Sequence, residues 1–159
     1  MSHFDSLRAE AHAMHEIGAV FALTSLHHVY GAIHYATPWR YHVVLFSAIA
    51  LAVILGAFWL SRVRLDTTPG AIARWVFRVG SLIVPVLLVG GFEGLYNHVV
   101  KIVLYLGGLP EPWMMGLFPP PTYEMPGDVF FEVTGVLQVV PAMMAAYHLV
   151  VSSRAPRRN

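Results

Sequence analysis

Hydrophobic residues fill four long stretches of the chain, at 15–36, 43–60, 76–106 and 129–151. A helix needs about 20 mostly apolar residues to cross the roughly 30 Å hydrocarbon core of a bilayer, so each stretch is long enough to span one. The second stretch is the clearest, because it holds one serine and no ionisable side chain. Pro85 and Pro141 predict bends in the last two. The pattern predicts an all-α fold, a four-helix transmembrane bundle that occupies residues 1–159 as a single domain, with an outer loop at 107–128.

Composition supports a membrane protein and excludes several kinds of chemistry. Of the 159 residues, 57% are hydrophobic and 12% are charged, and the mean hydropathy is +0.60, which is too apolar for an ordinary soluble domain. The chain contains no cysteine, so disulfides and thiolate metal sites are excluded. A formal net charge of +1 gives no basis for nucleic-acid binding. We expect the lipid bilayer as the main partner, together with a homo-oligomer or a larger membrane complex, and no nucleic acid.

Arginines are concentrated on one side of the predicted membrane. With four spans, the N-terminus, the second connection and the C-terminus share a side, whereas the opposite side holds only one arginine, Arg40. Cytoplasmic segments carry the excess of Lys and Arg, so both termini are expected to be cytoplasmic, in a multi-pass protein of a prokaryotic-type inner membrane. The first stretch lacks a small-residue cleavage site, so we expect it to be retained as a helix. The arginines on the predicted cytoplasmic side are Arg8, Arg62, Arg64, Arg74, Arg78, Arg154, Arg157 and Arg158.

The third stretch contains the polar segment "FEGLYNHVVK", residues 92–101. Glu93, Asn97 and Lys101 follow one another at steps of four and therefore share one face of a helix, with His98 at the flank. Gly90 and Gly94 lie on or beside this face with the spacing GxxxG, which permits a neighbouring helix to approach closely. The segment is therefore expected to face other helices rather than lipid.

Two further stretches place ionisable residues at a similar depth. His27 and His34 lie on one helical stripe of the first stretch, whereas His28 lies well off that stripe. His27 falls near the middle of the membrane, and His34 falls in the outer half together with Glu132 of the last stretch. A charged group that faces hydrocarbon costs at least a few kcal/mol. We therefore expect a polar pocket among the first, third and fourth helices, in the outer half of the bundle.

Metal binding is the preferred interpretation of this pocket, in a redox or small-molecule role. Imidazole and carboxylate suit zinc, copper, iron or manganese. The spacing contains neither the HExxH motif nor the Glu-x-x-His pairs of di-iron bundles, so the identity of the metal is not predicted. The candidate ligands are His27, His34, Glu93, His98 and Glu132, with Asn97 and Lys101 in supporting positions.

Haem is a weaker alternative for the cofactor. It requires two axial ligands on facing helices, which His27 or His34 could supply on one side and His98 on the other. The neighbouring glutamate, asparagine and lysine are not needed for haem ligation. A metal ion therefore accounts for more of the polar residues than haem does.

Two other kinds of function remain open. The protein could couple to proton movement, bind a lipid-soluble substrate, or act as an enzyme. In each case Glu93, His98 and Glu132 would serve as acid–base groups. No nucleophile or cofactor motif is present, so the sequence does not decide whether the protein is an enzyme. Alternatively, the polar residues form interhelical hydrogen bonds in a structural subunit of a larger membrane complex.

Overall fold

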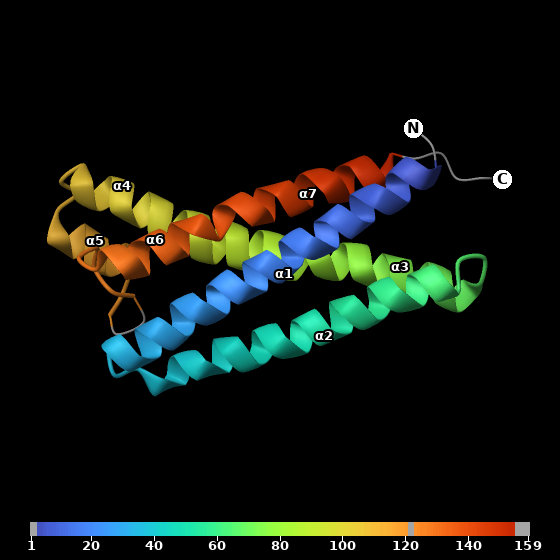
Figure 1. Cartoon of the computed structure of the whole chain (residues 1–159). Helices are drawn as coiled ribbons and strands as arrows, with labels where there is room; N and C mark the ends of the chain where they lie inside the picture. The colour runs from blue at the N-terminus through green and yellow to red at the C-terminus, as the bar shows by residue number, and fades with distance from the viewer. Residues whose placement is uncertain (1–2, 121–122, 155–159) are drawn as a thin grey trace.

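The computed structural model describes residues 3–120 and 123–154, and its regular elements are all helices (Figure 1). No strand occurs in these residues, so the all-α prediction is confirmed for them. Arg157 and Arg158, which contributed to the predicted orientation, lie outside the described residues. The elements are α1 (His3–His34), η1 (Pro38–Arg40), α2 (Tyr41–Val63), α3 (Thr68–Ser81), η2 (Leu82–Val100), α4 (Lys101–Leu106), α5 (Glu111–Leu117), α6 (Val129–Leu137) and α7 (Val139–Ser153).

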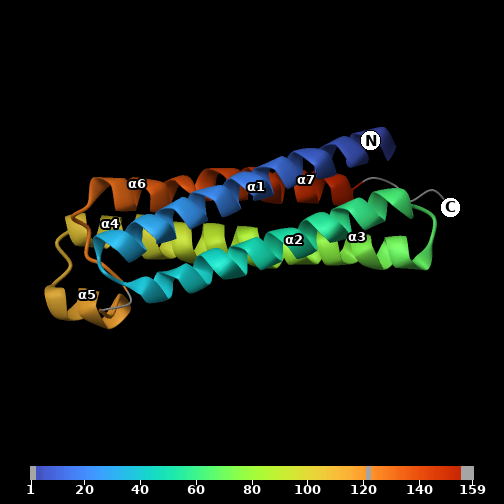
Figure 2. The ribbon, with the colours of Figure 1, turned by 60° about the horizontal axis from the view of Figure 1, so that its bottom comes forward.

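Three helical segments are long and apolar enough to cross a membrane: Pro38–Val63, Thr68–Leu106 and Val129–Ser153. They contain the predicted stretches at 43–60, 76–106 and 129–151. The remaining predicted span, 15–36, overlaps α1, which ends at His34. α1 is not among these segments because its histidines, glutamates and other polar residues lower its hydropathy. α1 nevertheless packs along both α2 and α7 (Figures 1 and 2).

Both prolines predicted to bend a helix lie where the helix changes. The segment Thr68–Leu106 becomes a π-helix at Leu82, three residues before Pro85. α6 ends at Leu137, and Pro141 has no N–H to donate to the Leu137 carbonyl, which an uninterrupted α-helix would require. The last helical segment is therefore divided into α6 and α7 at this point.

An apolar core fills the half of the bundle that holds the start of α1 and the end of α7 (Figure 1). Its residues come from α1, α2, α3 and α7, so it joins helices that are distant in sequence. Burial of such side chains contributes about 1.5–3 kcal/mol each. The cluster consists of Ala13, Met14, Ile17, Phe21, Ile54, Phe77, Ala145 and Leu149.

A buried ion cluster closes the end of this core. Glu10 of α1 is only 1% exposed, and its carboxylate accepts hydrogen bonds from Nη2 and Nε of Arg78 at 2.8 and 3.1 Å. Nη2 of Arg62 lies 3.5 Å from the second oxygen of the same carboxylate. A buried carboxylate is tolerated only when it is paired in this way. The cluster thereby connects α1 to α2 and α3.

Glycines allow η2 to lie close to the last helical segment. A Cβ atom at Gly90 would overlap Ala142, and one at Gly94 would lie 2.8 Å from Cγ2 of Val139. The predicted role of this GxxxG pair in close helix approach is therefore confirmed. The close approach brings the polar face of η2 against α6.

The described parts of the predicted outer loop, 107–120 and 123–128, pack onto the end of the bundle opposite the apolar core. The loop contains α5, from which Met114 is buried, and Phe118 just after α5 is also buried. The backbone oxygen of Glu124 accepts a hydrogen bond from Nζ of Lys101 at 2.6 Å. Asp128 ends the loop and caps α6, because its carboxylate accepts a hydrogen bond from the Phe131 N–H at 3.0 Å. The loop therefore covers the polar residues of η2 and α6.

Candidate metal centre

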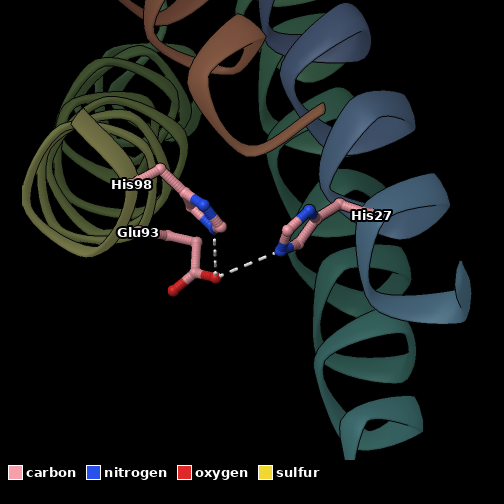
Figure 3. Close-up of side chains that lie close together, drawn as sticks. All are labelled: His27, Glu93 and His98. Atoms are coloured by element: carbon pink, nitrogen blue, oxygen red, sulfur yellow. Dashed lines mark ion pairs between the residues drawn. The ribbon is translucent and has the colours of Figure 1, made fainter. Parts of the chain in front are cut away.

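Three of the predicted ligands lie together between α1 and η2. One ligand atom from each of His27, Glu93 and His98 can be chosen so that all three atoms lie within 4.8 Å of one another (Figure 3). His27 is fully buried and His98 is 2% exposed. Their rings meet edge to face, with 4.7 Å between the ring centroids. This group could hold a metal ion.

The π-helix explains why Glu93 and His98 share one face. They are five residues apart, which in an α-helix would separate their side chains by about 140° around the axis. In a π-helix the backbone hydrogen bond joins residues i and i+5, so positions five apart lie nearly above one another. The predicted α-helical spacing placed His98 at the flank of the polar face, and the observed helix turns it toward Glu93.

Three imidazole nitrogens converge on a single oxygen of Glu93. The Oε1 atom lies 3.6 Å from Nε2 of His27, 3.6 Å from Nε2 of His28 and 3.7 Å from Nε2 of His98. The other oxygen, Oε2, accepts a hydrogen bond from Nδ2 of Asn97 at 2.8 Å. Ligand atoms of a tetrahedral metal ion with bonds of about 2.1 Å lie roughly 3.4 Å apart. The observed N–O separations are close to this spacing.

Thr134 determines the tautomer of His27. The Thr134 hydroxyl donates its hydrogen to the backbone oxygens of Phe130 and Phe131, at 2.8 and 3.0 Å. Its oxygen is therefore available to accept the Nδ1–H of His27, which lies 3.1 Å away. A neutral His27 that donates from Nδ1 has its lone pair on Nε2. This nitrogen has no hydrogen-bond partner among the described residues.

Glu132 has the same effect on His98. Nδ1 of His98 lies 2.7 Å from Oε2 of Glu132 and donates a hydrogen bond to it, so that a neutral His98 has its lone pair on Nε2. The second oxygen of Glu132 accepts a hydrogen bond from Nζ of Lys101 at 2.9 Å. Metal-binding histidines usually donate their other ring nitrogen to a carboxylate in this way, which fixes the ring and raises its basicity. Glu132 therefore orients a ligand, and it lies outside the three-residue group.

With both imidazoles neutral and donating from Nδ1, the Nε2 atoms of His27 and His98 present lone pairs to a carboxylate oxygen at 3.6 and 3.7 Å. These acceptors repel one another unless a cation or a proton lies between them. A metal ion bound by all three residues removes the repulsion.

Charge balance around the group also favours a cation. Glu93, Glu124 and Glu132 supply three carboxylates, whereas Arg40 and Lys101 supply two positive charges. With neutral histidines this set has one negative charge in excess. Unpaired charge in a protein interior is unfavourable, so an additional positive charge stabilises the site.

Gly135 makes room for His98. A Cβ atom at Gly135 would overlap the imidazole ring of His98. Phe131, one turn earlier on α6, stacks on the ring of His27 with 4.0 Å between centroids. α6 therefore holds both imidazoles from the side opposite Glu93.

His34, another predicted ligand, lies in a different contact. Its Nε2 atom is 3.3 Å from Oδ2 of Asp128, and its side chain is 51% exposed. Tyr30 donates a hydrogen bond to the same Asp128 oxygen at 2.6 Å and stacks on His34. This hydrogen bond and the Phe131 N–H lower the pKa of Asp128. The structure therefore brings together three of the five predicted ligands, with Glu132 beside them and His34 apart.

Sequence reasoning missed His28, Arg40 and Thr134. His28 was set aside because it lies off the stripe of His27, but both rings reach Glu93 because α1 is buried on more than one side. The adjacent pair His27–His28 was the available signal. Arg40 lies outside the predicted spans, and nothing in its local sequence connects it to Glu124. Thr134 acts through its hydroxyl, which periodicity does not reveal.

A cavity of about 270 Å³ opens beside the three-residue group. Glu93 and His98 lie in its wall together with His28, Asn97 and Lys101. A metal ion held by two imidazoles and one carboxylate keeps at least one coordination position free for water or a small molecule. The cavity supplies space for such a molecule next to Glu93.

The histidine pairs do not fit haem. The 4.7 Å between the ring centroids of His27 and His98 leaves no room for a porphyrin between them. His34 contacts Asp128 and Tyr30 rather than facing His98. The group His27, Glu93 and His98 could hold a metal ion, but these histidine pairs could not hold haem.

Comparisons with known proteins found no match. No family model matches the sequence, and neither the curated proteins nor the solved structures gave a match. The function is therefore argued from the residues of the site.

Replacing Gly135 by alanine is predicted to disturb the site through His98. The added methyl group overlaps the imidazole, and overpacking of this kind costs about 1–3 kcal/mol. The matched control is Gly18→Ala, because a Cβ atom at Gly18 meets no atom within 4 Å. Thermal unfolding in detergent should show a lower melting temperature for Gly135→Ala and an unchanged or higher one for Gly18→Ala. Equal melting temperatures for the two variants would contradict the described packing of His98.

Proposed function

We propose that this chain is an integral membrane protein that binds a metal ion at His27, Glu93 and His98. Membrane insertion is supported first by the distribution of side chains in the protein, with apolar side chains on its surface and polar ones inside. Large apolar side chains such as Leu45, Ile49 and Val53 of α2 are more than half exposed. Buried positions include His27 and Lys101, which would be on the surface of an ordinary soluble protein. Lipid is the solvent in which this distribution is stable.

In this proposal α1 crosses the membrane with the other helices. α1 has 32 residues and packs along α2 and α7, two helices that are long and apolar enough to span. Its polar residues are turned inward: Glu10, Thr24 and His27 are each no more than 1% exposed. The low hydropathy of α1 is thus compatible with insertion, because neighbouring helices cover its polar side chains.

The proposed orientation places both termini in the cytoplasm and the site in the outer half of an inner membrane. The start of α1, the α2–α3 turn and the end of α7 lie at one end of the molecule (Figure 1). Arg8, Arg62, Arg64 and Arg154 belong to this end. The positive-inside rule then assigns it to the cytoplasm. The site lies toward the other end, beneath the loop that contains α5.

The observation that carries the metal proposal is Nε2 of His27, which has no hydrogen-bond partner among the described residues and lies 3.6 Å from Oε1 of Glu93. Two imidazoles and one carboxylate form the ligand sets of catalytic zinc sites and of non-haem iron sites. Both kinds of site keep a coordination position free, as the cavity beside Glu93 would permit. A redox or small-molecule reaction is therefore the proposed role.

An acid–base role is the second candidate, and a different observation favours it. Lys101, Glu132, His98 and Glu93 follow one another at distances of 2.9, 2.7 and 3.7 Å. Such a row of titratable groups can pass a proton between its members. In this alternative a proton, rather than a metal ion, lies between His98 and Glu93. Metal analysis separates the two candidates.

The orientation can be tested with two exposed tryptophans. Trp113 of α5 and Trp75 of α3 are 68% and 65% exposed and lie toward opposite ends of the molecule. Because the chain contains no cysteine, Trp113→Cys and Trp75→Cys each introduce a single thiol. In intact cells, a membrane-impermeant maleimide should label Trp113→Cys, whereas Trp75→Cys should react only after permeabilisation. The reverse pattern would contradict the proposed orientation, and labelling of both variants in intact cells would contradict membrane insertion.

Metal content tests the proposed site. Mass-spectrometric element analysis of the purified full chain should find about one transition-metal ion per chain in the wild type. His27→Ala and His98→Ala should remove it, while the matched control His34→Ala should retain it. Thr134→Val should weaken metal affinity by about 10–100-fold, because Thr134 orients His27 from outside the ligand set. A folded, metal-free wild-type protein that also fails to bind added zinc or iron would overturn the proposal, as would equal metal content in His27→Ala and the wild type.

A further inference from the structure

The cavity beside Glu93 is bounded by helices that are expected to face lipid. It lies between α1, the start of α2 and η2, and it has a volume of about 270 Å³. Figure 1 shows α2 joined to α3 at one end of the molecule and separated from α4 at the other. The cavity is found toward the separated end, since its wall includes Val43 of α2 and Lys101 of α4.

The mouth of the cavity is apolar. Leu88 and Phe92 of η2 line it and are 48% and 50% exposed, and Trp39 of η1 is 41% exposed. Val43 lines the opposite wall on α2. These residues belong to the segments Pro38–Val63 and Thr68–Leu106, both of which are long and apolar enough to cross a membrane. In the proposed membrane placement, these exposed apolar side chains contact lipid, and they form the mouth through which a lipid-soluble molecule would enter.

The inner end of the cavity has unused hydrogen-bonding capacity. Nδ1 of His28 and Oδ1 of Asn97 have no hydrogen-bond partner among the described residues, although these residues are 6% and 2% exposed. Nζ of Lys101 donates to Glu124 and Glu132 and retains one further hydrogen. Buried polar atoms without partners are unfavourable, so a ligand that bonds to them is stabilised. Both a donor and an acceptor are available to such a ligand.

The charges in the wall disfavour an anionic head group. Nη2 of Arg40 lies 3.4 Å from a carboxylate oxygen of Glu124, and Nζ of Lys101 lies 2.9 Å from one of Glu132. Each cation that lines the cavity is therefore already paired among the described residues. An anionic head group such as a carboxylate would compete with these glutamates for the same cations.

The size of the cavity limits the ligand to one small head group. Sites that enclose drug-sized molecules have volumes of about 300–1,000 Å³, and this cavity of about 270 Å³ is slightly smaller. Aromatic side chains of Trp39, Phe92 and Phe131 line it, which suits a flat ring. The apolar remainder of a lipid-soluble molecule would stay between α2 and η2, in the membrane.

We propose that the cavity binds the head group of a membrane-soluble quinone, which enters from the lipid between α2 and η2. Lys101 donates to a carbonyl oxygen of the ring, and Asn97 Oδ1 or His28 Nδ1 accepts from a hydroxyl when the ring is reduced. This inference rests on the proposed membrane insertion, and it does not require the metal ion. It adds a ligand class that the metal ligands alone do not specify.

Binding can be measured by quenching of Trp39 fluorescence. Phe replaces Trp59, Trp75 and Trp113 in the full chain, so that Trp39 is the remaining tryptophan. Decyl-ubiquinone is then titrated into the protein in lipid nanodiscs. The proposal predicts saturable quenching, because the probe binds at a defined site lined by Trp39. Quenching that rises linearly with the probe concentration indicates partition into lipid and would overturn the proposal.

Paired variants on η2 test the entry route. Leu88→Phe fills the mouth and should weaken binding about tenfold, which corresponds to about 1.4 kcal/mol. Leu87→Phe is the matched control, because Leu87 is 55% exposed on the same helix and does not line the cavity. Val43→Phe narrows the opposite wall and should act like Leu88→Phe. Equal affinity in all three variants would overturn the proposed site.

Two further variants separate quinone binding from the proposed membrane insertion and from the proposed metal site. Leu88→Phe should retain wild-type metal content, and when it is combined with Trp113→Cys it should retain the maleimide labelling of Trp113→Cys, so loss of quinone binding in Leu88→Phe is specific to the cavity. His27→Ala should lose the metal ion and retain saturable quenching. Complete displacement of the probe by an equal concentration of oleate would show that the site prefers an anionic amphiphile, and this result would contradict a quinone site.

Discussion

The candidate site depends on the contact between the Glu93 carboxylate and the imidazoles that surround it. Three Nε2 atoms lie 3.6 to 3.7 Å from one oxygen of Glu93, whose side chain is 21% exposed. Thr134 and Glu132 contact Nδ1 of His27 and His98, so that each ring, when it is neutral and donates from Nδ1, presents its Nε2 lone pair to this oxygen. Such a contact is unfavourable without a positive charge between the atoms. The proposed metal ion supplies that charge, and the packing of α1, η2 and α6 holds its ligands in place.

The two ends of the bundle are held together by different kinds of contact. At the end that holds the start of α1, apolar packing and the Glu10–Arg78 pair connect the helices. Toward the other end, polar contacts replace the apolar core, and the loop before α6 closes over them through Glu124 and Lys101. The site end of the bundle nevertheless contains buried polar atoms without hydrogen-bond partners among the described residues, and a cavity. Such atoms are unfavourable for folding and become favourable when a ligand binds.

Periodicity and depth predicted the helices and part of the site. His27, Glu93 and His98 were selected because they are ionisable residues at similar heights in apolar stretches, and the structure brings these three together. The angular relation between Glu93 and His98 was not predictable from α-helical spacing, since η2 is a π-helix. The positions of Arg40 and Glu124 depend on how a connection folds back onto the bundle, which local sequence does not encode. His34 was predicted as a ligand because it shares the helical stripe of His27 and a similar depth, but its side chain contacts Asp128 next to the start of α6.

The most direct test of the metal site is an anomalous diffraction experiment at the zinc absorption edge, on crystals of the full chain grown with zinc. The proposal predicts one strong anomalous peak about 2.0–2.2 Å from Nε2 of His27, Nε2 of His98 and a carboxylate oxygen of Glu93. A well-ordered site with no peak between these residues would contradict it. A strong peak found only at a different histidine, such as His148 beside Glu16, would contradict it equally.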